Sequence, residues 1–299
     1  MFKGCGTALV TPFTRDGALD QTTLRELVRR QIESGINFLV PCGTTGENPT
    51  LTREEHLRVV EITLEEAKGV VPVLAGAGGY NTAEVIELAK QVEELGADGI
   101  LSVTPYYNKP TQEGLYQHYK AIASAVSLPV VVYSVQGRTG VNVEPLTLKR
   151  LAEIDNIVGV KEASGNLAQI AAVVHHVPER FMVLSGDDAV AMPVIALGGR
   201  GLISVSANEI PAEMTQLVRS ALNGDFEAAR RIQRRYFPLL EVNFVESNPI
   251  PVKAAMALMS LLEPVWRLPL VPPSPANQQK IEKVLDGLGL LAARSVHAG

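Results

Sequence analysis

The segment Ile157-Val158-Gly159-Val160-Lys161-Glu162 is a short apolar run that ends abruptly in two charged residues. A continuous apolar run of this length is typical of a strand that is covered on both faces, as the strands of parallel sheets are. Similar runs recur along the chain, and together they predict eight strands: Gly6–Val10, Phe38–Pro41, Val71–Ala75, Gly99–Val103, Val130–Tyr133, Ile157–Val160, Phe181–Leu184 and Gly201–Val205.

Longer amphipathic segments lie between these runs, and the clearest of them predict helices over Thr22–Ser34, Arg53–Lys68, Thr82–Leu95, Gln112–Val126 and Pro145–Glu153. Asp20, Thr52 and Asn81 are suitable N-cap residues, and Thr52 with Glu55 forms a capping-box sequence. Regular alternation of eight strands with helices predicts a closed (β/α)8 TIM barrel, an α/β fold.

A doubly wound open sheet is the alternative α/β architecture. It usually has fewer strands, and it places a phosphate-binding glycine-rich turn after its first strand. Neither Gly4-Cys5-Gly6 nor Gly76-Ala77-Gly78 continues into such a turn. The barrel is therefore the better prediction.

The pattern changes after residue 222, where no further strand is predicted. Three helical segments joined by proline-rich connections follow: Asp225–Phe237, Pro251–Leu262 and Ala276–Leu291. We therefore expect a catalytic barrel domain over residues 1–222 and a C-terminal helical domain over residues 223–299.

Composition excludes several classes of protein. The chain has 299 residues, 46% of them hydrophobic, and a formal net charge of −5, which argues against disorder, nucleic-acid binding and binding to an anionic membrane. Cys5 and Cys42 are isolated, so neither a disulfide framework nor a CxxC pair is present. With no signal-like N-terminus and no unbroken apolar stretch long enough to span a bilayer, we expect a cytoplasmic protein.

Active sites of (β/α)8 barrels lie at the carboxyl ends of the strands, where Lys161 stands out. A lysine at the end of an apolar strand is costly to bury as an ammonium ion, and its neutral amine is a nucleophile suited to Schiff-base formation with a carbonyl substrate. The alternative is a structural lysine that reaches solvent or pairs with Glu162.

Other polar groups follow the neighbouring strands. A Schiff-base enzyme needs a proton shuttle, which the Tyr133 phenol and the Thr44 hydroxyl can supply. The frame of Gly43 and Gly46 lets backbone amides approach an anion such as a carboxylate. Arg138 is a natural carboxylate partner, with an exposed surface arginine as the alternative.

Metal chemistry finds little support in the sequence. The five histidines show no ligand spacing of a known metal site. Glu47, Asp187 and Asp188 could form an oxygen cage, but capping of helices is the better interpretation. We therefore expect no metal.

Together, these motifs resemble the dihydrodipicolinate synthase (4-hydroxy-tetrahydrodipicolinate synthase) family, within the N-acetylneuraminate lyase superfamily of class I aldolases. The resemblance covers the whole chain. It rests on Gly43-Thr44-Thr45-Gly46-Glu47, Tyr106-Tyr107, Tyr133 with Arg138-Thr139-Gly140, Lys161-Glu162-Ala163-Ser164 and Ser185-Gly186-Asp187.

The resemblance implies a lyase that condenses pyruvate with L-aspartate 4-semialdehyde in diaminopimelate and lysine biosynthesis. It implies a homotetramer, built as a dimer of dimers, that needs no cofactor. Lys161 would carry the pyruvate Schiff base. Thr44, Tyr133 and Tyr107 would form the proton relay, with Tyr107 reaching in from a neighbouring subunit.

The resemblance also implies the substrate-binding residues. Thr45, Gly186 and Ile203 would contact pyruvate, and Arg138 would guide the carboxylate of the semialdehyde at the mouth of the site.

The chain departs from the family pattern in two places. Ser134 and Gln136 stand where the family usually has asparagine and proline, so we expect a freer turn before Arg138 and altered handling of the second substrate. Tyr80 and Arg53 stand where lysine-inhibited members typically have Asn and often His, so we expect weak or absent lysine inhibition. Three residues match the effector site: His56, Glu84 and Tyr106.

Two other functions remain open. One is another pyruvate-dependent aldolase, such as an N-acetylneuraminate lyase or a keto-deoxy sugar acid aldolase, against which Thr44-Thr45 and Arg138 argue. The other is a non-catalytic barrel that binds a 2-oxo acid, which would have no need of a proton relay.

Overall fold

The computed structural model describes residues 1–291, in which all eight predicted strands are present within a few residues of their expected bounds. The strands are parallel. They are β1 Gly4–Ala8, β2 Phe38–Val40, β3 Leu74–Gly76, β4 Gly99–Val103, β5 Val130–Ser134, β6 Ile157–Glu162, β7 Met182–Ser185 and β8 Gly201–Ser204.

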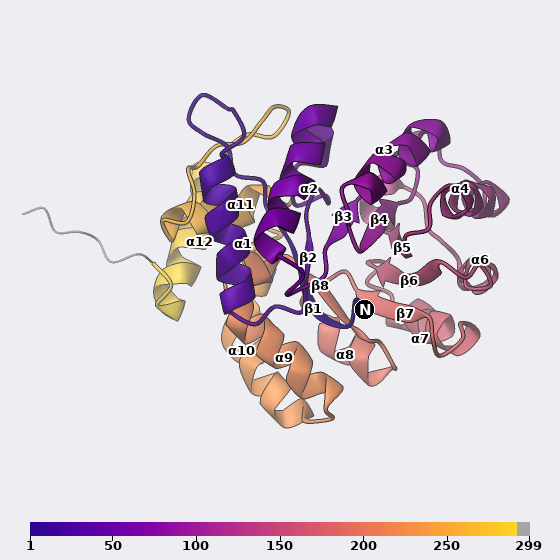
Figure 1. The fold of residues 1–299 in the computed structure, drawn as a ribbon. Helices are drawn as coiled ribbons and strands as arrows, with labels where there is room; N and C mark the ends of the chain where they lie inside the picture. The colour runs from indigo at the N-terminus through magenta and orange to yellow at the C-terminus, as the bar shows by residue number, and fades with distance from the viewer. Residues whose placement is uncertain (292–299) are drawn as a thin grey trace, which may run out of the picture.

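The sheet closes on itself. Strands β1 to β8 are hydrogen-bonded in the order β2-β1-β8-β7-β6-β5-β4-β3, and a parallel bridge between Leu39 and Val73 joins the two ends. Helices surround the strands (Figure 1). The predicted (β/α)8 TIM barrel is therefore confirmed.

The helices around the barrel begin at the predicted caps. Asp20, Thr52 and Asn81 each accept a hydrogen bond from a backbone amide of the first turn, and the capping box of Thr52 and Glu55 is complete. The helices are α1 Gln21–Glu33, α2 Arg53–Ala67, α3 Thr82–Glu94, α4 Gln112–Ala125, α5 Gln136–Thr139, α6 Pro145–Leu151, α7 Leu167–His176, α8 Ala191–Ala196 and α9 Pro211–Leu222.

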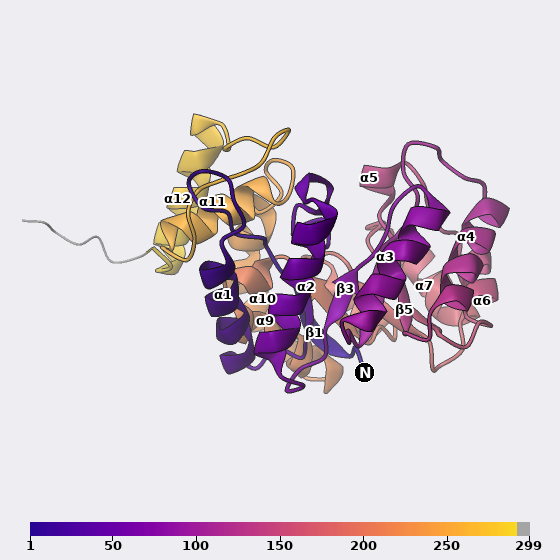
Figure 2. The ribbon, with the colours of Figure 1, turned by 45° about the horizontal axis from the view of Figure 1, so that its top comes forward.

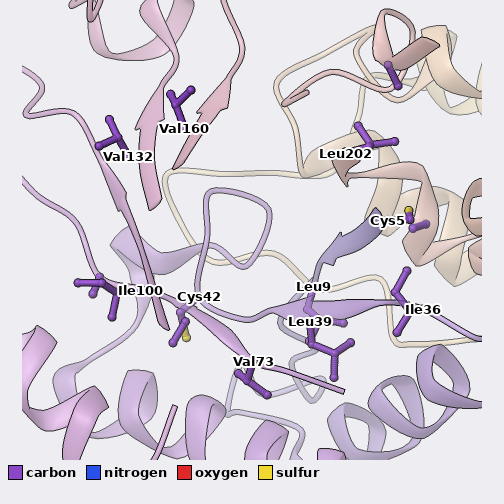
Figure 3. Packing of buried hydrophobic residues seen from close by; sticks show 14 of the residues in the cluster. Cys5, Leu9, Ile36, Leu39, Cys42, Val73, Ile100, Val132, Val160 and Leu202 are labelled. Atoms are coloured by element: carbon purple, nitrogen blue, oxygen red, sulfur yellow. The ribbon is translucent and has the colours of Figure 1, made fainter. Parts of the chain in front are cut away.

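The core has two layers because side chains alternate along each strand. Val132 and Val160, neighbours on β5 and β6, belong to the large cluster between strands and helices (Figure 3). Val131 and Tyr133, the residues on either side of Val132 in sequence, face the barrel interior and pack in the same cluster as Ile203.

Three further helices form the C-terminal part: α10 Phe226–Val242, α11 Ile250–Leu258 and α12 Pro275–Leu288. Helix α10 packs against α9, and α12 packs against α10 and α11. The three helices lie on the side of the barrel that carries α1 (Figures 1 and 2). The division into two domains at residue 222 stays a prediction, and residues 292–299 of the expected second domain lie outside the described residues.

The predicted end of α10 at Phe237 is wrong. The helix continues through Pro238 to Val242, although proline removes one hydrogen bond of a helix. Leu239, Leu240 and Val242 are buried, and their packing offsets that loss. Helix α11, in contrast, ends at Leu258, before the expected Leu262.

No helix within residues 1–291 is both long enough and apolar enough to cross a membrane.

Candidate active site

Lys161 and Tyr133 lie side by side inside the barrel. They are direct partners in the register of β5 and β6, and alternation sends both side chains to the interior. The Nζ atom of Lys161 lies 4.2 Å from the centroid of the Tyr133 ring. Lys161 is only 4% exposed, so it is not a lysine that reaches solvent.

Lys161 does not pair with its neighbour Glu162. The Glu162 carboxylate instead accepts hydrogen bonds from the Ser164 amide over 3.2 Å and from Gln169 Nε2 over 2.8 Å. No ion pair of Lys161 is present among residues 1–291. Lys161 therefore neither reaches solvent nor pairs with Glu162, and its amine is free to attack a carbonyl carbon.

Gly186, at the end of β7, leaves room for the Lys161 side chain. A Cβ atom there would lie 3.1 Å from Lys161 Cε and 2.7 Å from the Ala163 Cβ, which is too close. Ile203 on β8 is fully buried in the interior cluster that contains Tyr133. Gly186 thus forms part of the wall around the Lys161 side chain, and Ile203 lies in the same interior cluster as Tyr133.

A cavity of about 240 Å³ opens at the carboxyl ends of the strands. Thr44, Tyr133 and Arg138 contribute to it together. The backbone amides of Thr44 and Thr45 make no hydrogen bond to any of residues 1–291 and can bind an anion. The remaining lining residues are Cys42, Gly43, Asn48, Pro49, Gly76, Ala77, Gly78, Leu101, Val103, Tyr106, Val135 and Thr139.

Asn248 is a residue of this region that the sequence reasoning missed. Its Nδ2 donates to Thr45 Oγ1 over 3.0 Å, and its carbonyl accepts from Arg138 Nη2 over 2.8 Å. Arg138 is therefore exposed, as the alternative had it, but it lines the cavity and is held there by a hydrogen bond. The Asn248-Pro249 pair signals a turn, but a turn signal alone does not indicate a site.

Tyr107 is not brought to the cavity of its own chain. The residue is 92% exposed and adopts a left-handed backbone conformation with φ 65°. Its neighbour Tyr106 lines the cavity instead. The expected three-residue proton relay is therefore incomplete within one chain.

The acidic residues considered as helix caps differ in their contacts. The carboxylate of Asp187 accepts a hydrogen bond from the Ala189 amide, just before α8. Glu47 forms a buried ion pair with Lys253, 2.5 Å between Oε1 and Nζ. Asp188 accepts hydrogen bonds from Ser204 Oγ and from the amides of Val205 and Ser206. Throughout residues 1–291, no three His, Cys, Asp or Glu side chains are grouped to hold a metal ion.

A second cavity, of about 320 Å³, lies next to the first and shares Tyr106 with it. Both ring nitrogens of His56 are engaged, Nδ1 with Asn48 Oδ1 and Nε2 with the Gly76 carbonyl, each over 2.9 Å. Burial lowers the pKa of His56 to about 4. Nη1 of Arg53 is buried and makes no hydrogen bond within the described chain.

A (β/α)8 barrel with an unpaired, buried lysine beside a tyrosine at its carboxyl end is the architecture of a Schiff-base-forming class I aldolase. The model of the Dihydrodipicolinate synthetase family matches residues 1–288. The chain therefore belongs to this family of enzymes.

The chain resembles several characterised proteins over nearly its full length. It is 54% identical over 295 residues to the 4-hydroxy-tetrahydrodipicolinate synthase of Koribacter versatilis, covering 98% of each chain. A monomeric dihydrodipicolinate synthase variant has a TM-score of 0.95 at 47% identity, with 97% and 98% coverage. The chloride-inhibited enzyme from Acinetobacter baumannii, complexed with pyruvate, has a TM-score of 0.96 at 44% identity, with 97% and 100% coverage.

Proposed function

We propose that this enzyme is a 4-hydroxy-tetrahydrodipicolinate synthase, which condenses pyruvate with L-aspartate 4-semialdehyde in lysine biosynthesis. The observation that carries the proposal is the Lys161 amine, which is buried, unpaired with any carboxylate of residues 1–291 and 4.2 Å from the centre of the Tyr133 ring. The names of its relatives support the same reaction.

The chemistry starts at Lys161. Its neutral amine attacks the keto carbon of pyruvate, and the resulting carbinolamine loses water to form the Schiff base. Loss of a methyl proton then gives an enamine, whose carbon attacks the aldehyde carbon of the second substrate while the aldehyde oxygen takes up a proton and the Schiff base re-forms. The amino group of the second substrate then attacks the Schiff-base carbon, which closes the ring and releases the Lys161 amine. Tyr133 and Thr44, with Tyr107 from a second copy of the chain, move these protons.

Substrate carboxylates are bound by two features of the site. The free amides of Thr44 and Thr45 receive the pyruvate carboxylate, with Gly186 and Ile203 forming the wall around it. Arg138, held by Asn248, receives the carboxylate of the semialdehyde. No step of this scheme needs a cofactor.

The proposal includes a homotetramer in the cytoplasm. The highly exposed Tyr107 supports association, because an exposed tyrosine beside an incomplete relay suits a residue that completes the site of another copy. The unpaired, buried Cys5 and Cys42 suit a reducing compartment.

Pyruvate consumption with three aldehydes tests the proposed function: L-aspartate 4-semialdehyde, N-acetylmannosamine and glyceraldehyde. Turnover with the semialdehyde alone is expected. Preference for a sugar aldehyde would reassign the substrate and would point to the Ser134–Arg138 turn, which includes Gln136 at the start of α5, as the cause. No turnover with any of the three would favour a 2-oxo acid binding protein.

We expect Tyr133→Phe to lower kcat about a hundredfold, because the variant keeps the ring beside Lys161 but loses the proton donor. Steady-state kinetics measures the loss. Tyr119→Phe is the matched control: its hydroxyl is buried but donates to the Ser102 carbonyl, away from the cavity, so turnover should be unchanged. A kcat for Tyr133→Phe close to that of the control would refute the proton-transfer role.

We expect lysine to inhibit weakly, with half-maximal inhibition above about 1 mM. The charge of Arg53 in the second cavity repels the lysine ammonium groups, and the Glu84 carboxylate already accepts a hydrogen bond from Asn81 over 2.8 Å. Activity measured against lysine concentration tests this. The double variant Arg53→His/Tyr80→Asn should be inhibited more strongly. Half-maximal inhibition of the unchanged enzyme by sub-millimolar lysine would refute the expectation.

A further inference from the structure

Asn248 connects two loops of the barrel that belong to different strands. Thr45 lies in the turn after β2, and Arg138 lies in the short helix after β5. The side chain of Asn248 donates a hydrogen bond to Thr45, and its backbone carbonyl accepts a hydrogen bond from Arg138. Asn248 is 5% exposed, so water competes little for either hydrogen bond.

The C-terminal segment that carries Asn248 contacts the turn after β2 at a second point. Lys253, on α11, is fully buried and forms its ion pair with Glu47, two residues after Thr45. The Lys253 Nζ atom also lies 4.4 Å from the centroid of the Phe13 ring. Because Asn248 contacts Thr45 and Lys253 contacts Glu47, the segment between them places Asn248 in a fixed position relative to the Thr44–Glu47 turn.

Arg138 depends on this contact. The side chain is exposed, and α5, which carries it, is a single turn of four residues. Within the described part of the chain, the hydrogen bond to the Asn248 carbonyl is the only one that the guanidinium makes. A guanidinium without it would sample several rotamers, and binding a carboxylate would then cost additional side-chain entropy.

We propose that Asn248 is a positioning residue for the second substrate, which sets the Arg138 guanidinium at a fixed place relative to the Thr44–Thr45 turn. The inference rests on the proposed function, in which Arg138 binds the carboxylate of the aldehyde. It assigns to the C-terminal helical part a role in substrate selection as well as in packing.

A double-mutant cycle tests the proposal. KM for L-aspartate 4-semialdehyde is measured for the unchanged enzyme, Asn248→Ala, Arg138→Ala and the double variant. We expect Asn248→Ala to raise KM about tenfold when Arg138 is present, because the variant keeps the backbone carbonyl that accepts from Arg138 but loses the side-chain hydrogen bond to Thr45 that fixes the position of this carbonyl. In the Arg138→Ala background, Asn248→Ala should change KM less than about twofold, because Asn248 acts through Arg138. An equal rise in both backgrounds would overturn the proposal.

Asn243 supplies a matched control from the same C-terminal part. It is buried as Asn248 is, and its Nδ2 donates to Ser206 Oγ over 3.1 Å and to Glu209 Oε2 over 2.5 Å. We expect both Asn243→Ala and Asn248→Ala to lower Tm, but Asn243→Ala should leave KM for L-aspartate 4-semialdehyde unchanged. Equal KM values for the two variants would also overturn the proposal. Should Asn248→Ala fail to fold, Asn248→Ser takes its place in the cycle.

The experiment separates this inference from the proposed function. Borohydride trapping with saturating pyruvate reports Lys161 alone and should reach the same extent in all four proteins of the cycle. If the unchanged enzyme rejects L-aspartate 4-semialdehyde, the proposed function fails, and the cycle is run with the carboxylate-bearing aldehyde that it accepts. Failure to accept any such aldehyde would overturn both.

Discussion

Replacing Lys161 with alanine is expected to lower turnover of pyruvate with L-aspartate 4-semialdehyde at least about a thousandfold, because the variant lacks the amine that forms the proposed covalent intermediate. The same variant should lose inactivation by borohydride in the presence of pyruvate, since reduction traps only a Schiff base. Steady-state kinetics and mass spectrometry of the reduced protein measure the two effects.

Lys253 makes the trapping experiment specific. It is as deeply buried as Lys161, but its amine is paired with Glu47 and also lies against the Phe13 ring. The reduced pyruvate adduct of the unchanged enzyme should therefore map to the peptide of Lys161 and not to that of Lys253. Trapping that survives in Lys161→Ala would refute the assignment of the nucleophile.

Replacing Lys253 with methionine is expected to lower the free energy of unfolding by about 3–5 kcal/mol, because the buried Glu47 carboxylate is left without its counter-charge. Burial lowers the pKa of Lys253, and the nearby Glu47 carboxylate opposes that shift. Both side chains are fully buried, so water cannot replace the lost partner. Urea unfolding of the two proteins measures the difference.

Two further variants control for this effect. Lys253→Met/Glu47→Gln removes both charges and should recover part of the lost stability. Arg231→Ala breaks an ion pair with Glu227 in which both side chains are mostly exposed, and it should cost less than about 0.5 kcal/mol. A double variant no more stable than Lys253→Met would contradict the charge argument, as would an equal loss in Arg231→Ala.

The strands were the most predictable part of the fold. Each run between residues 6 and 205 is mostly apolar, because barrel strands are covered by helices outside and by side chains inside. Helix starts were predictable for a similar reason, since a cap such as Thr52 acts on amides only a few residues away. The four-residue helix α5 has no periodicity to detect, and the continuation of α10 through Pro238 depends on burial that the local sequence does not encode.

The site was predictable only in part. Lys161 and Tyr133 end neighbouring strands, so their proximity followed from strand register. Thr44 and Arg138 follow strand ends that meet at the same mouth. The role of Tyr107 came from the family resemblance, and its exposed position leaves that role a prediction.

The amino-acid sequence alone determined the eight-stranded barrel, its capped helices and the place of Lys161 at the end of a strand, because these follow from patterns of neighbouring residues along the chain. Only the tertiary structure decided that Asn248 reaches Thr45, 203 residues away, and that Lys253 reaches Glu47, 206 residues away. Contacts between such distant residues depend on how the C-terminal helices pack on the barrel. That packing buries the Glu47–Lys253 pair, and no local pattern in either segment specifies the other as its partner.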